Sequence, residues 1–451
     1  MRSPRLRTYV VAAGLIAATA FAVWMERRQP DRAPLLASAT APTVVFVVLD
    51  TVRADHTSLC GYGRPTTPTL EALAEKGACT CQAVSPGAWT LPSHASYFTG
   101  APVLEHEADF AQAGGVQAAW DQSVSIRPLD GRLPTLAERF RDKGYQTVAL
   151  SANPVLAPDS GLQRGFEHFE ACKTKCRGSR LNERARRFFD RRLDRHRPLF
   201  LFANYMDAHS EWGPIPNAVA WVPPTRALAP NELVAEFLRG ELAPDQARAF
   251  LQRRTDLYDW GVHRADESLG QLLAALEMRG WFSDGYRLVV TSDHGELLGE
   301  HGLLDHGVSL HEENNRVPLC VVDTARVPPP FASRVSGLVV HDLLLGEPPG
   351  GHTIDSVAFP RTDLAERTPA GVELWTAHWE GSAKTVMHGE VVETYDLDAD
   401  AGEAAPTTPP PENEGRRHVV AEAQRASRLF AREGATSEKL LEILRAVGYV
   451  E

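Results

Sequence analysis

The stretch that decides the fold is VVFVVLDT, residues 44–51, an apolar run that ends in the acidic residue Asp50. A second run of this kind, RLVVTSDHGE at residues 287–296, ends in Asp293 and His294. Continuous Val and Leu runs are typical of strands buried on both faces of a parallel α/β sheet. Ligands of such sheets bind outside the carboxyl ends of the strands. The two runs therefore predict that Asp50, Asp293 and His294 hold a cation at one edge of a sheet.

Strand and helix patterns alternate between these two runs. Helices are expected near residues 69–76 and 135–143, strands at 146–150 and 198–203, and a long helix at about 253–278. This alternation predicts an α/β fold with a mixed, mostly parallel sheet flanked by helices.

The sequence pattern changes after about residue 323, where Pro-rich segments interrupt the chain. Short runs predict antiparallel strands at 371–379, 383–388 and 391–397, and a helical pattern runs from 418 to about 447. We therefore expect a large α/β domain at residues 42–325 and a small C-terminal α+β subdomain at 326–451.

The amino terminus is expected to be a separate piece. Arg residues precede an uncharged apolar stretch at residues 8–25, and a loose segment follows at 26–41. This pattern predicts a signal peptide or membrane anchor within residues 1–25 and then a linker. The protein is expected to be exported, either to the periplasm or with the catalytic domain held outside the cytoplasm.

Charge and cysteine content narrow the possible partners. The net charge of −11 and the absence of a basic face in the sequence argue against nucleic acid as a partner. Six cysteines in an oxidising compartment permit disulfides, and Cys172 with Cys176 is the most plausible close pair apart from the crowded Cys79 and Cys81. Cys60 and Cys320 are expected to be small buried apolar residues.

A candidate nucleophile lies between the two acid-bearing runs. The segment TLPSH, residues 90–94, is expected to open a helix, where unpaired amide donors and the positive helix end surround the first side chain. A hydroxyl there, next to a cation, loses its proton more easily and becomes a strong nucleophile. Thr90 is therefore the candidate, although the same segment alone is also compatible with a simple capped helix start.

Several ordered motifs resemble the sulfatases of the alkaline phosphatase superfamily. They are DTVRADH at 50–56, GYG at 61–63, TTPTL at 66–70, PSHAS at 92–96, YMDAH at 205–209, SDHGELLGEHG at 292–302, RVPL at 316–319 and TYDL at 394–397. The likeness covers nearly the whole chain after residue 42 and implies an alkaline-phosphatase-like fold.

The resemblance also implies roles for individual residues. Asp50, Asp293 and His294 would bind one divalent cation, and Thr90 would occupy the nucleophile position. His209 and His306 would act on the ester as catalytic residues. His94 and His301 are expected to contact the substrate. His306 stands where many sulfatases have a Lys, and its imidazole still donates a hydrogen bond to an ester oxygen.

Two departures from the sulfatase pattern bear on the reaction. Sulfatases make formylglycine from a Cys or Ser that is followed by Pro and Arg, whereas this chain has Thr90, Pro92 and His94. No formylglycine is expected, and the chain resembles the family branch in which Thr carries a phosphoryl-type group. Thr51 replaces the usual second acidic ligand, which leaves the identity of the metal open. Oxygen donors favour calcium, our first choice, or magnesium, whereas His294 favours manganese or zinc.

These observations predict a metal-dependent hydrolase for sulfuric or phosphoric esters of a small molecule, glycan or lipid. Two alternatives remain: a phosphotransferase for lipid headgroups or glycans, which an N-terminal membrane anchor would suit, and an inactive sulfatase-like binding protein. The alcohol half of the substrate has no readable signature in the sequence.

Overall fold

An eight-stranded sheet forms the centre of the computed structural model, which describes residues 41–432 except 112–115, 118–124, 211, 217–218, 227–232, 329, 332, 361–372 and 408–413. Its strands are β1 (Thr43–Leu49), β2 (Ala78–Val84), β6 (Gln146–Ser151), β7 (His168–Ala171), β8 (Leu199–Tyr205), β9 (Tyr286–Thr291), β12 (Arg316–Asp323) and β13 (Val335–Ser336).

The strand order is β13-β2-β12-β9-β1-β8-β6-β7. The run from β9 to β7 is parallel, whereas β12 is antiparallel to both β9 and β2. The predicted mixed, mostly parallel sheet is therefore confirmed.

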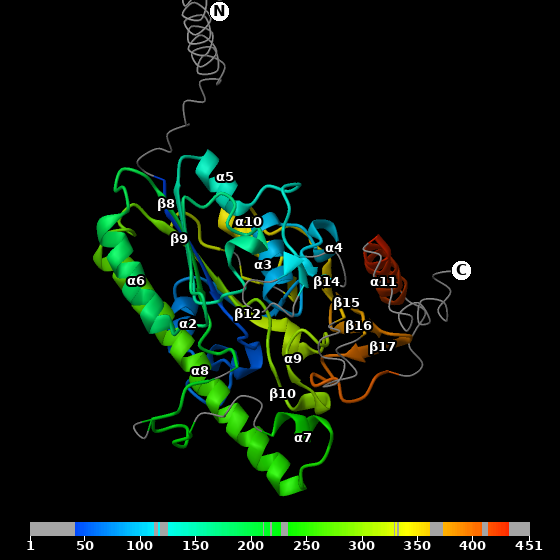
Figure 1. Ribbon diagram of the computed structural model, residues 1–451. Coiled ribbons are helices and arrows are strands. Elements are labelled where there is room, and N and C mark those ends of the chain that lie inside the picture. The colour runs from blue at the N-terminus through cyan, green and yellow to red at the C-terminus, as the bar shows by residue number, and fades with distance from the viewer. Residues whose placement is uncertain are drawn as a thin grey trace, which may run out of the picture.

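Helices cover both faces of this sheet (Figure 1). They are α2 (Pro68–Ala74), α3 (Thr90–Thr99), α5 (Leu136–Asp142), α6 (Gly178–Arg191), α8 (Pro244–Met278) and α10 (Val339–Leu345). Successive side chains of a strand point to opposite faces. In β1, Val45 and Val47 join the apolar core under α6 and α8, whereas Val44 and Phe46 join the core under α3, α5 and α10. Burial on both faces explains why β1 reads as an unbroken apolar run.

The long helix α8 begins nine residues before the expected position, at Pro244 rather than near 253. Its first turns carry few apolar residues, so hydrophobic spacing does not reveal them. The residues at the helix start reveal these turns. Pro244 is favoured at the first helical position because the amide donor that it lacks would be unpaired there anyway. The side chain of Gln246 also accepts a hydrogen bond from the Ala243 amide.

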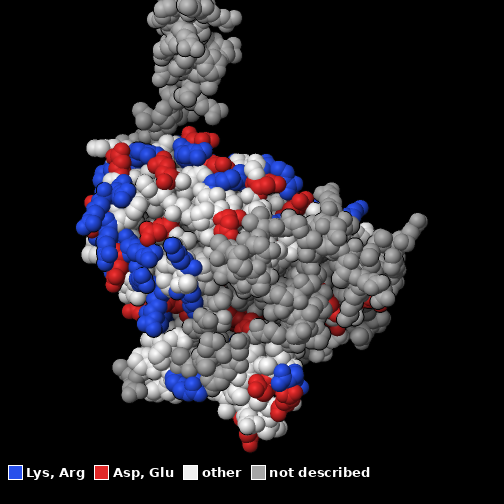
Figure 2. Space-filling view, in the orientation of Figure 1, with Lys and Arg blue, Asp and Glu red and all other residues white. Residues whose placement is uncertain are grey.

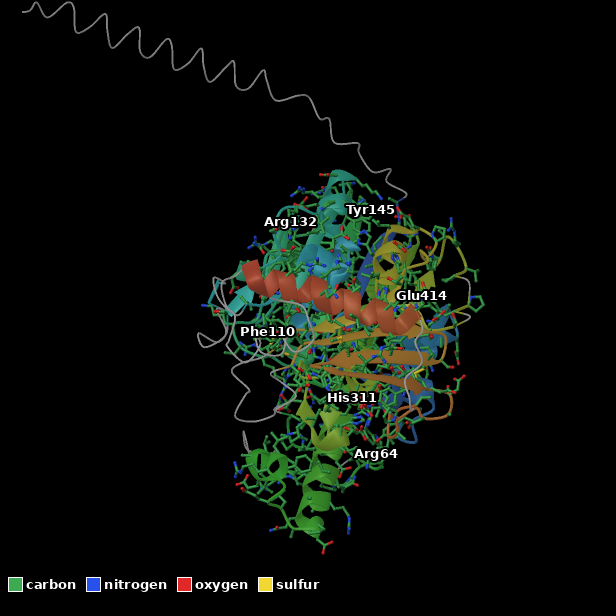
Figure 3. All side chains as sticks on the ribbon, turned by 90° about the vertical axis from the view of Figure 1, so that its right-hand side faces the viewer. Arg64, Phe110, Arg132, Tyr145, His311 and Glu414 are labelled. Carbon is green, nitrogen blue, oxygen red and sulfur yellow. A yellow bond between two sulfur atoms is a disulfide. The ribbon has the colours of Figure 1, made fainter. Side chains whose placement is uncertain are left out.

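The small antiparallel sheet expected near the carboxyl terminus is present. It contains β14 (Ile354–Ala358), β15 (Trp375–Glu380), β16 (Ala383–His388) and β17 (Val391–Asp396), in that order. Helix α11 (Glu414–Arg432) packs on β15 and β16, and Figure 3 shows it running from the labelled Glu414 across this sheet. β13 and α10, which follow residue 326, pack with the large sheet. The expected continuation of the last helix to 447 lies outside the described residues.

Shorter elements complete the described chain. The remaining strands are β3 (Asp109–Phe110), β4 (Val116–Gln117), β5 (Ser125–Arg127), β10 (Leu297–Leu298) and β11 (Leu304–Asp305). The remaining helices are α4 (Val103–His106), α7 (Val234–Leu238) and α9 (Glu312–Asn315), with 3-10 turns at Ala54–His56, Ser58–Cys60, Pro158–Ser160 and Glu300–Gly302.

All six cysteines form disulfides, which corrects part of the sequence-based expectation. Cys172 pairs with Cys176 as predicted, but Cys60 pairs with Cys81 and Cys79 pairs with Cys320. Cys320 and Cys79 face each other across the β12–β2 ladder. Strand pairing between segments 241 residues apart brings them together, and sequence spacing carries no sign of that pairing.

Within the described residues, no helix is long and apolar enough to cross a membrane. The predicted signal peptide or anchor at residues 1–25 and most of the linker at 26–41 lie outside the part of the chain that the structure describes.

Candidate active site

The carboxyl ends of four adjacent strands bring polar residues together. Asp50 follows β1, Asn204 lies in β8, Asn153 follows β6 and Asp293 follows β9, and all four side chains are fully buried. β9, β1, β8 and β6 are neighbours in the sheet. In a sheet with parallel strands this edge is where ligands bind, so the fold brings Asp50 and Asp293 to the edge where the sequence predicts a site.

Thr90 is the first residue of α3, and its hydroxyl faces these strand ends. Asn153 Nδ2 donates to Thr90 Oγ1 at 3.1 Å and to Asp50 Oδ2 at 2.7 Å. The orientation of the amide is fixed because Asn153 Oδ1 accepts from the Val155 amide at 2.8 Å. One side chain thus ties the threonine hydroxyl to the carboxylate.

Asn204 Oδ1 and His94 Nε2 lack hydrogen-bond partners among the described residues, and so do three atoms of the predicted metal ligands. These three atoms are Asp50 Oδ1, Asp293 Oδ2 and His294 Nε2. Ligand atoms of these three residues lie within 4.8 Å of one another. Buried polar groups are nearly always paired, so a converging unpaired set needs an explanation. Two carboxylates and an imidazole are common ligands of divalent cations. These three residues therefore fit the metal that the sequence predicts.

The orientation of His294 supports the same conclusion. Its Nδ1 lies 2.9 Å from the Gly295 carbonyl oxygen, which only accepts, so Nδ1 is protonated and Nε2 carries a lone pair. A backbone carbonyl fixes many metal-binding histidines in this way. His294 Nε2 lies 3.4 Å from Asp293 Oδ2. Donor atoms bound to one cation at about 2.1–2.4 Å lie roughly 3.4 Å apart.

Burial without a counter-charge alters the acidity of these groups. Burial, together with the nearby charge of Asp293, raises the pKa of Asp50 to about 7. Burial also raises the pKa of Asp293 to about 7, although amide hydrogen bonds from Thr51 and His294 oppose the shift. A cation between the two carboxylates would remove this penalty.

His94 lies one helical turn after Thr90 and is fully buried. Its Nδ1 is 2.8 Å from the Thr90 carbonyl oxygen and 3.6 Å from Asp293 Oδ2. The ring packs against Phe202 at a centroid distance of 5.7 Å, and burial lowers the pKa of His94 to about 3. The residue therefore lies beneath the site as a neutral imidazole. Its expected contact with substrate stays a prediction.

His209 and His306 form one wall of the site. Their ring centroids are 4.9 Å apart, and the His306 ring lies 4.4 Å from that of His294. Burial, followed by the charges of His306 and Lys175, lowers the pKa of His209 well below its ordinary value. The buried His209 ring is therefore neutral near pH 7 when no substrate is bound.

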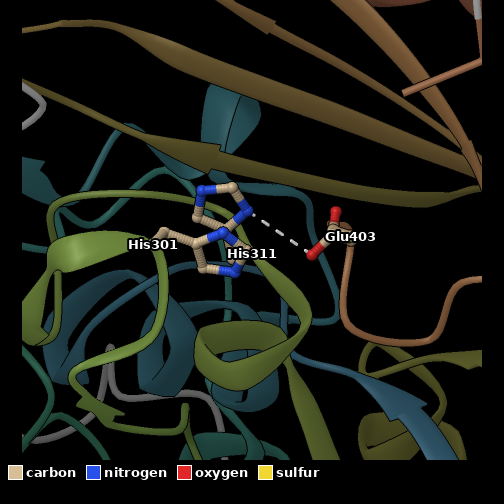
Figure 4. Close-up of side chains that lie close together, drawn as sticks. All are labelled: His301, His311 and Glu403. Carbon is tan, nitrogen blue, oxygen red and sulfur yellow. Dashed lines mark ion pairs between the residues drawn. The ribbon is translucent and has the colours of Figure 1, made fainter. Parts of the chain in front are cut away.

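His301 has different neighbours. It stacks on His311 at a centroid distance of 3.6 Å, and Figure 4 shows both rings beside Glu403, whose carboxylate is 3.5 Å from His311 Nδ1. Both oxygens of Glu403 are already engaged, by Lys384 Nζ at 2.7 Å and by the Glu312 amide at 2.6 Å. This cluster is therefore a poor cation site, and substrate binding by His301 stays a prediction.

Sequence reasoning missed four residues near the site: Asn153, Asn204, Lys175 and Glu296. Burial raises the pKa of Glu296 to about 8, and its carboxylate is 3.4 Å from His306 Nδ1. Lys175 Nζ donates to the His209 carbonyl oxygen at 2.6 Å. Asn153 and Asn204 were recoverable, because both lie at the ends of strands that the sequence predicts. Neutral amides at strand ends are weaker signals of a site than acids and histidines.

Comparison with known proteins gives the family. The family model described as Sulfatase matches residues 42–344. The chain is 25% identical over 277 residues to the phosphatidylethanolamine transferase Mcr-1 of Escherichia coli, covering 59% of this chain and 44% of that protein. Mcr-2 of the same organism is 24% identical over 277 residues, with coverage of 59% and 45%. The chain thus spans less than half the length of these curated relatives.

Solved structures share the fold. The phosphonate monoester hydrolase of Agrobacterium radiobacter matches with a TM-score of 0.61 and 16% identity, covering 87% of this chain and 96% of that one. The structure of BT4656 in complex with its substrate D-glucosamine-2-N,6-O-disulfate matches with a TM-score of 0.63 and 15% identity, covering 87% and 98%. At these identities the likeness establishes the fold alone.

Proposed function

The chain belongs to the sulfatase family, and from this membership we propose that it is a metal-dependent hydrolase of phosphoric or sulfuric esters with the Thr90 hydroxyl as nucleophile. One observation carries the proposal. Thr90 Oγ1 shares the Asn153 amide with Asp50, beside the unpaired atoms of Asp293 and His294.

Asp50, Asp293 and His294 would hold the divalent cation, which when bound lowers the pKa of a hydroxyl beside it and offsets negative charge on an ester. Asn153 holds the Thr90 oxygen against Asp50. The amino-terminal end of α3 adds a positive dipole at the same point. These features favour the ionised form of the Thr90 hydroxyl.

The reaction has two steps. The Thr90 oxygen attacks phosphorus, a Thr90 O–P bond forms, and the bond from phosphorus to the leaving alcohol breaks. The leaving oxygen takes a proton from His209 or His306, whose rings line the wall of the site. Water then attacks phosphorus and gives a proton to the imidazole that lost one, the Thr90 O–P bond breaks, and phosphate leaves with the ionised Thr90 oxygen restored. An anionic substrate beside His209 favours its protonated form, which offsets the effect of burial.

Phosphoric esters fit this nucleophile better than sulfuric esters. The O–P bond of a phosphothreonine is cleaved when water or an alcohol attacks phosphorus. A sulfated threonine lacks an easy exit, since the elimination that frees sulfate from a formylglycine hydrate needs a second hydroxyl on the same carbon. Thr90 has only one.

A phosphotransferase is the second candidate, and the similarity to Mcr-1 and Mcr-2, both phosphatidylethanolamine transferases, favours it. The two candidates share the first step. They differ in whether water or a substrate alcohol attacks the phosphothreonine.

Matched phosphate and sulfate esters, assayed with and without an alcohol acceptor, test the proposal. We expect phosphate release without acceptor, loss of activity in Thr90→Ala and partial activity in Thr90→Ser. Thr99→Ala, at the other end of α3, is the control and should remain active. Turnover only with the alcohol would identify a transferase. Equal activity of Thr90→Ala would overturn both candidates, and no turnover of any ester would indicate the inactive binding protein.

We also propose that the protein acts outside the cytoplasm, in the periplasm or anchored by its N-terminal segment. The pairing of all six cysteines supports this, because such bonds persist in oxidising compartments. Protease treatment of intact cells and of cells with a permeabilised outer membrane tests the location. Resistance of the full-length protein in both would contradict it.

A further inference from the structure

A groove lined by basic side chains borders the site. We define the basic groove by Lys173, Lys175, Arg177, Arg180 and Arg184, which line a cavity of about 580 Å³. A second cavity of about 390 Å³ adjoins it, and the two share Lys175, Cys176 and Arg177. Neither cavity belongs to the cluster around Thr90.

The positive charge of this groove is concentrated in a short stretch of chain. Figure 2 shows Lys and Arg gathered over the region of α6, on a protein whose net charge is −11. Arg184 pairs with Glu170 at 3.1 Å. Among the described residues, by contrast, no carboxylate lies within 4.0 Å of a charged nitrogen of Lys173, Arg177 or Arg180. Like charges held together in a hollow attract an anionic ligand.

Lys175 connects the groove to the catalytic wall. Its ammonium donates to the carbonyl oxygens of His209 and Ser210. The loop that carries Lys173 and Lys175 is closed by the Cys172–Cys176 disulfide, directly after β7. Since β7 is parallel to β6 in the same sheet, this loop lies at the edge where Asn153 and Asp50 lie.

The adjoining cavity is lined by both apolar and charged side chains. Trp260, Pro214 and Ile215 give it apolar surface, and Arg177, Arg264 and Lys175 give it positive charge. Asp207 also lines it and pairs with Arg264 at 3.5 Å. An indole face packs well on a pyranose ring, while the cations suit sulfate or phosphate substituents. A flat membrane surface does not enter hollows of this kind.

We propose that the basic groove binds a second anionic group on the alcohol half of the substrate, which is therefore a sugar carrying more than one sulfate or phosphate. This inference rests on the proposed function for its reacting ester, but the binding it describes is measurable without turnover. Lys173 and Arg180 contact the remote anion, and the Thr90 centre holds the reacting one.

Binding of a fluorescent heparin tetrasaccharide by the full chain tests the proposal. Two variants each lose two positive charges: Lys173→Gln with Arg180→Gln in the groove, and Arg187→Gln with Arg191→Gln on the outer part of α6. Because two cations that contact the anion are lost, the groove pair should weaken binding about tenfold. The outer pair should change it less than about twofold. Thr90→Ala should still bind.

The remaining outcomes overturn the proposal. Equal weakening of tetrasaccharide binding in both variants would mean that net charge alone attracts the sugar. Unchanged binding in the groove variant would show that the groove does not bind the sugar. Vesicles of phosphatidylglycerol and phosphatidylcholine form a second arm. If only vesicle binding depends on the groove pair, the surface docks a membrane instead. Failure of the proposed hydrolysis leaves these binding results intact, so the two failures are distinguishable.

Discussion

At the scale of single residues, the site depends on an amide that sequence analysis overlooked. Asn153 donates to both Thr90 and Asp50, and its carbonyl oxygen is held by the Val155 amide. The amide positions the hydroxyl without adding charge to a region that already contains two buried carboxylates. An acid at position 153 would repel Asp50 and leave Thr90 Oγ1 without a donor.

Asn153→Ala should lower kcat by about 10- to 100-fold, the usual cost of losing a residue that orients the groups of a metal site. The loss should appear in kcat more than in KM, because the amide contacts the nucleophile. Asn182→Ala is a matched control, since this buried Asn binds Tyr205 and Ser268 away from Thr90. The control should lower stability and leave kcat unchanged. An unchanged kcat in Asn153→Ala, with a lowered kcat in Asn182→Ala, would show that Asn153 has no role in the mechanism.

At the scale of elements, a buried ion pair attaches the C-terminal sheet to the catalytic domain. Lys384 on β16 is fully buried, and its Nζ contacts Glu403 at 2.7 Å and the Leu310 carbonyl oxygen at 2.6 Å. Glu403 also accepts from the amide of Glu312, the first residue of α9. Two loops and a strand therefore meet at one charge pair.

This pair predicts a specific acid sensitivity. Burial alone would raise the pKa of Glu403, but Lys384 first and then His311 outweigh it and lower the pKa from its ordinary 4.5 to about 2. The stabilisation is therefore present above about pH 4.5 and is lost as pH falls toward 2. By linkage it amounts to at most about 3 kcal/mol.

Urea unfolding between pH 6 and pH 3 measures the effect. The wild type should lose more stability over this range than Lys384→Met with Glu403→Gln, which removes both charges together. Glu380→Gln, an exposed change on β15, is the control and should behave as wild type. Parallel pH profiles in all three proteins would show that the pair does not contribute.

Much of this element-level structure was predictable from sequence. The apolar runs ending at Asp50 and Asp293 identified the central strands because both faces of those strands are buried. Hydrophobic spacing found α8 from about residue 253 onward but missed its polar first turns. The Cys79–Cys320 and Cys60–Cys81 pairs were not predictable, because they depend on which strands become neighbours. His301 was grouped with the site by motif, whereas its neighbours come from α9 and the C-terminal subdomain.

At the scale of the whole molecule, the cation would connect segments far apart in sequence. Asp50 and Asp293 lie on different strands, and without a cation both are buried without a full counter-charge. A ligand that binds only the folded state stabilises it by mass action, by about 4 kcal/mol at a thousand times its Kd. Metal binding should therefore be visible in global stability.

Chelation should lower the Tm of the wild type by several degrees, and readdition of the bound metal, identified by elemental analysis, should restore it. Asp293→Asn should show little response to either treatment. Asp284→Asn, an exposed change at the opposite end of β9, should respond as wild type does. An Asp293→Asn protein that responds fully would place the stabilising metal elsewhere.

The most direct test of the central claim is the mass of the protein after brief incubation with a phosphate ester and acid quenching. The account predicts a phosphoryl group located on the peptide that contains Thr90, present in the wild type and absent from Thr90→Ala. Release of phosphate with no adduct at Thr90 in the wild type, or an adduct at another residue, would contradict it.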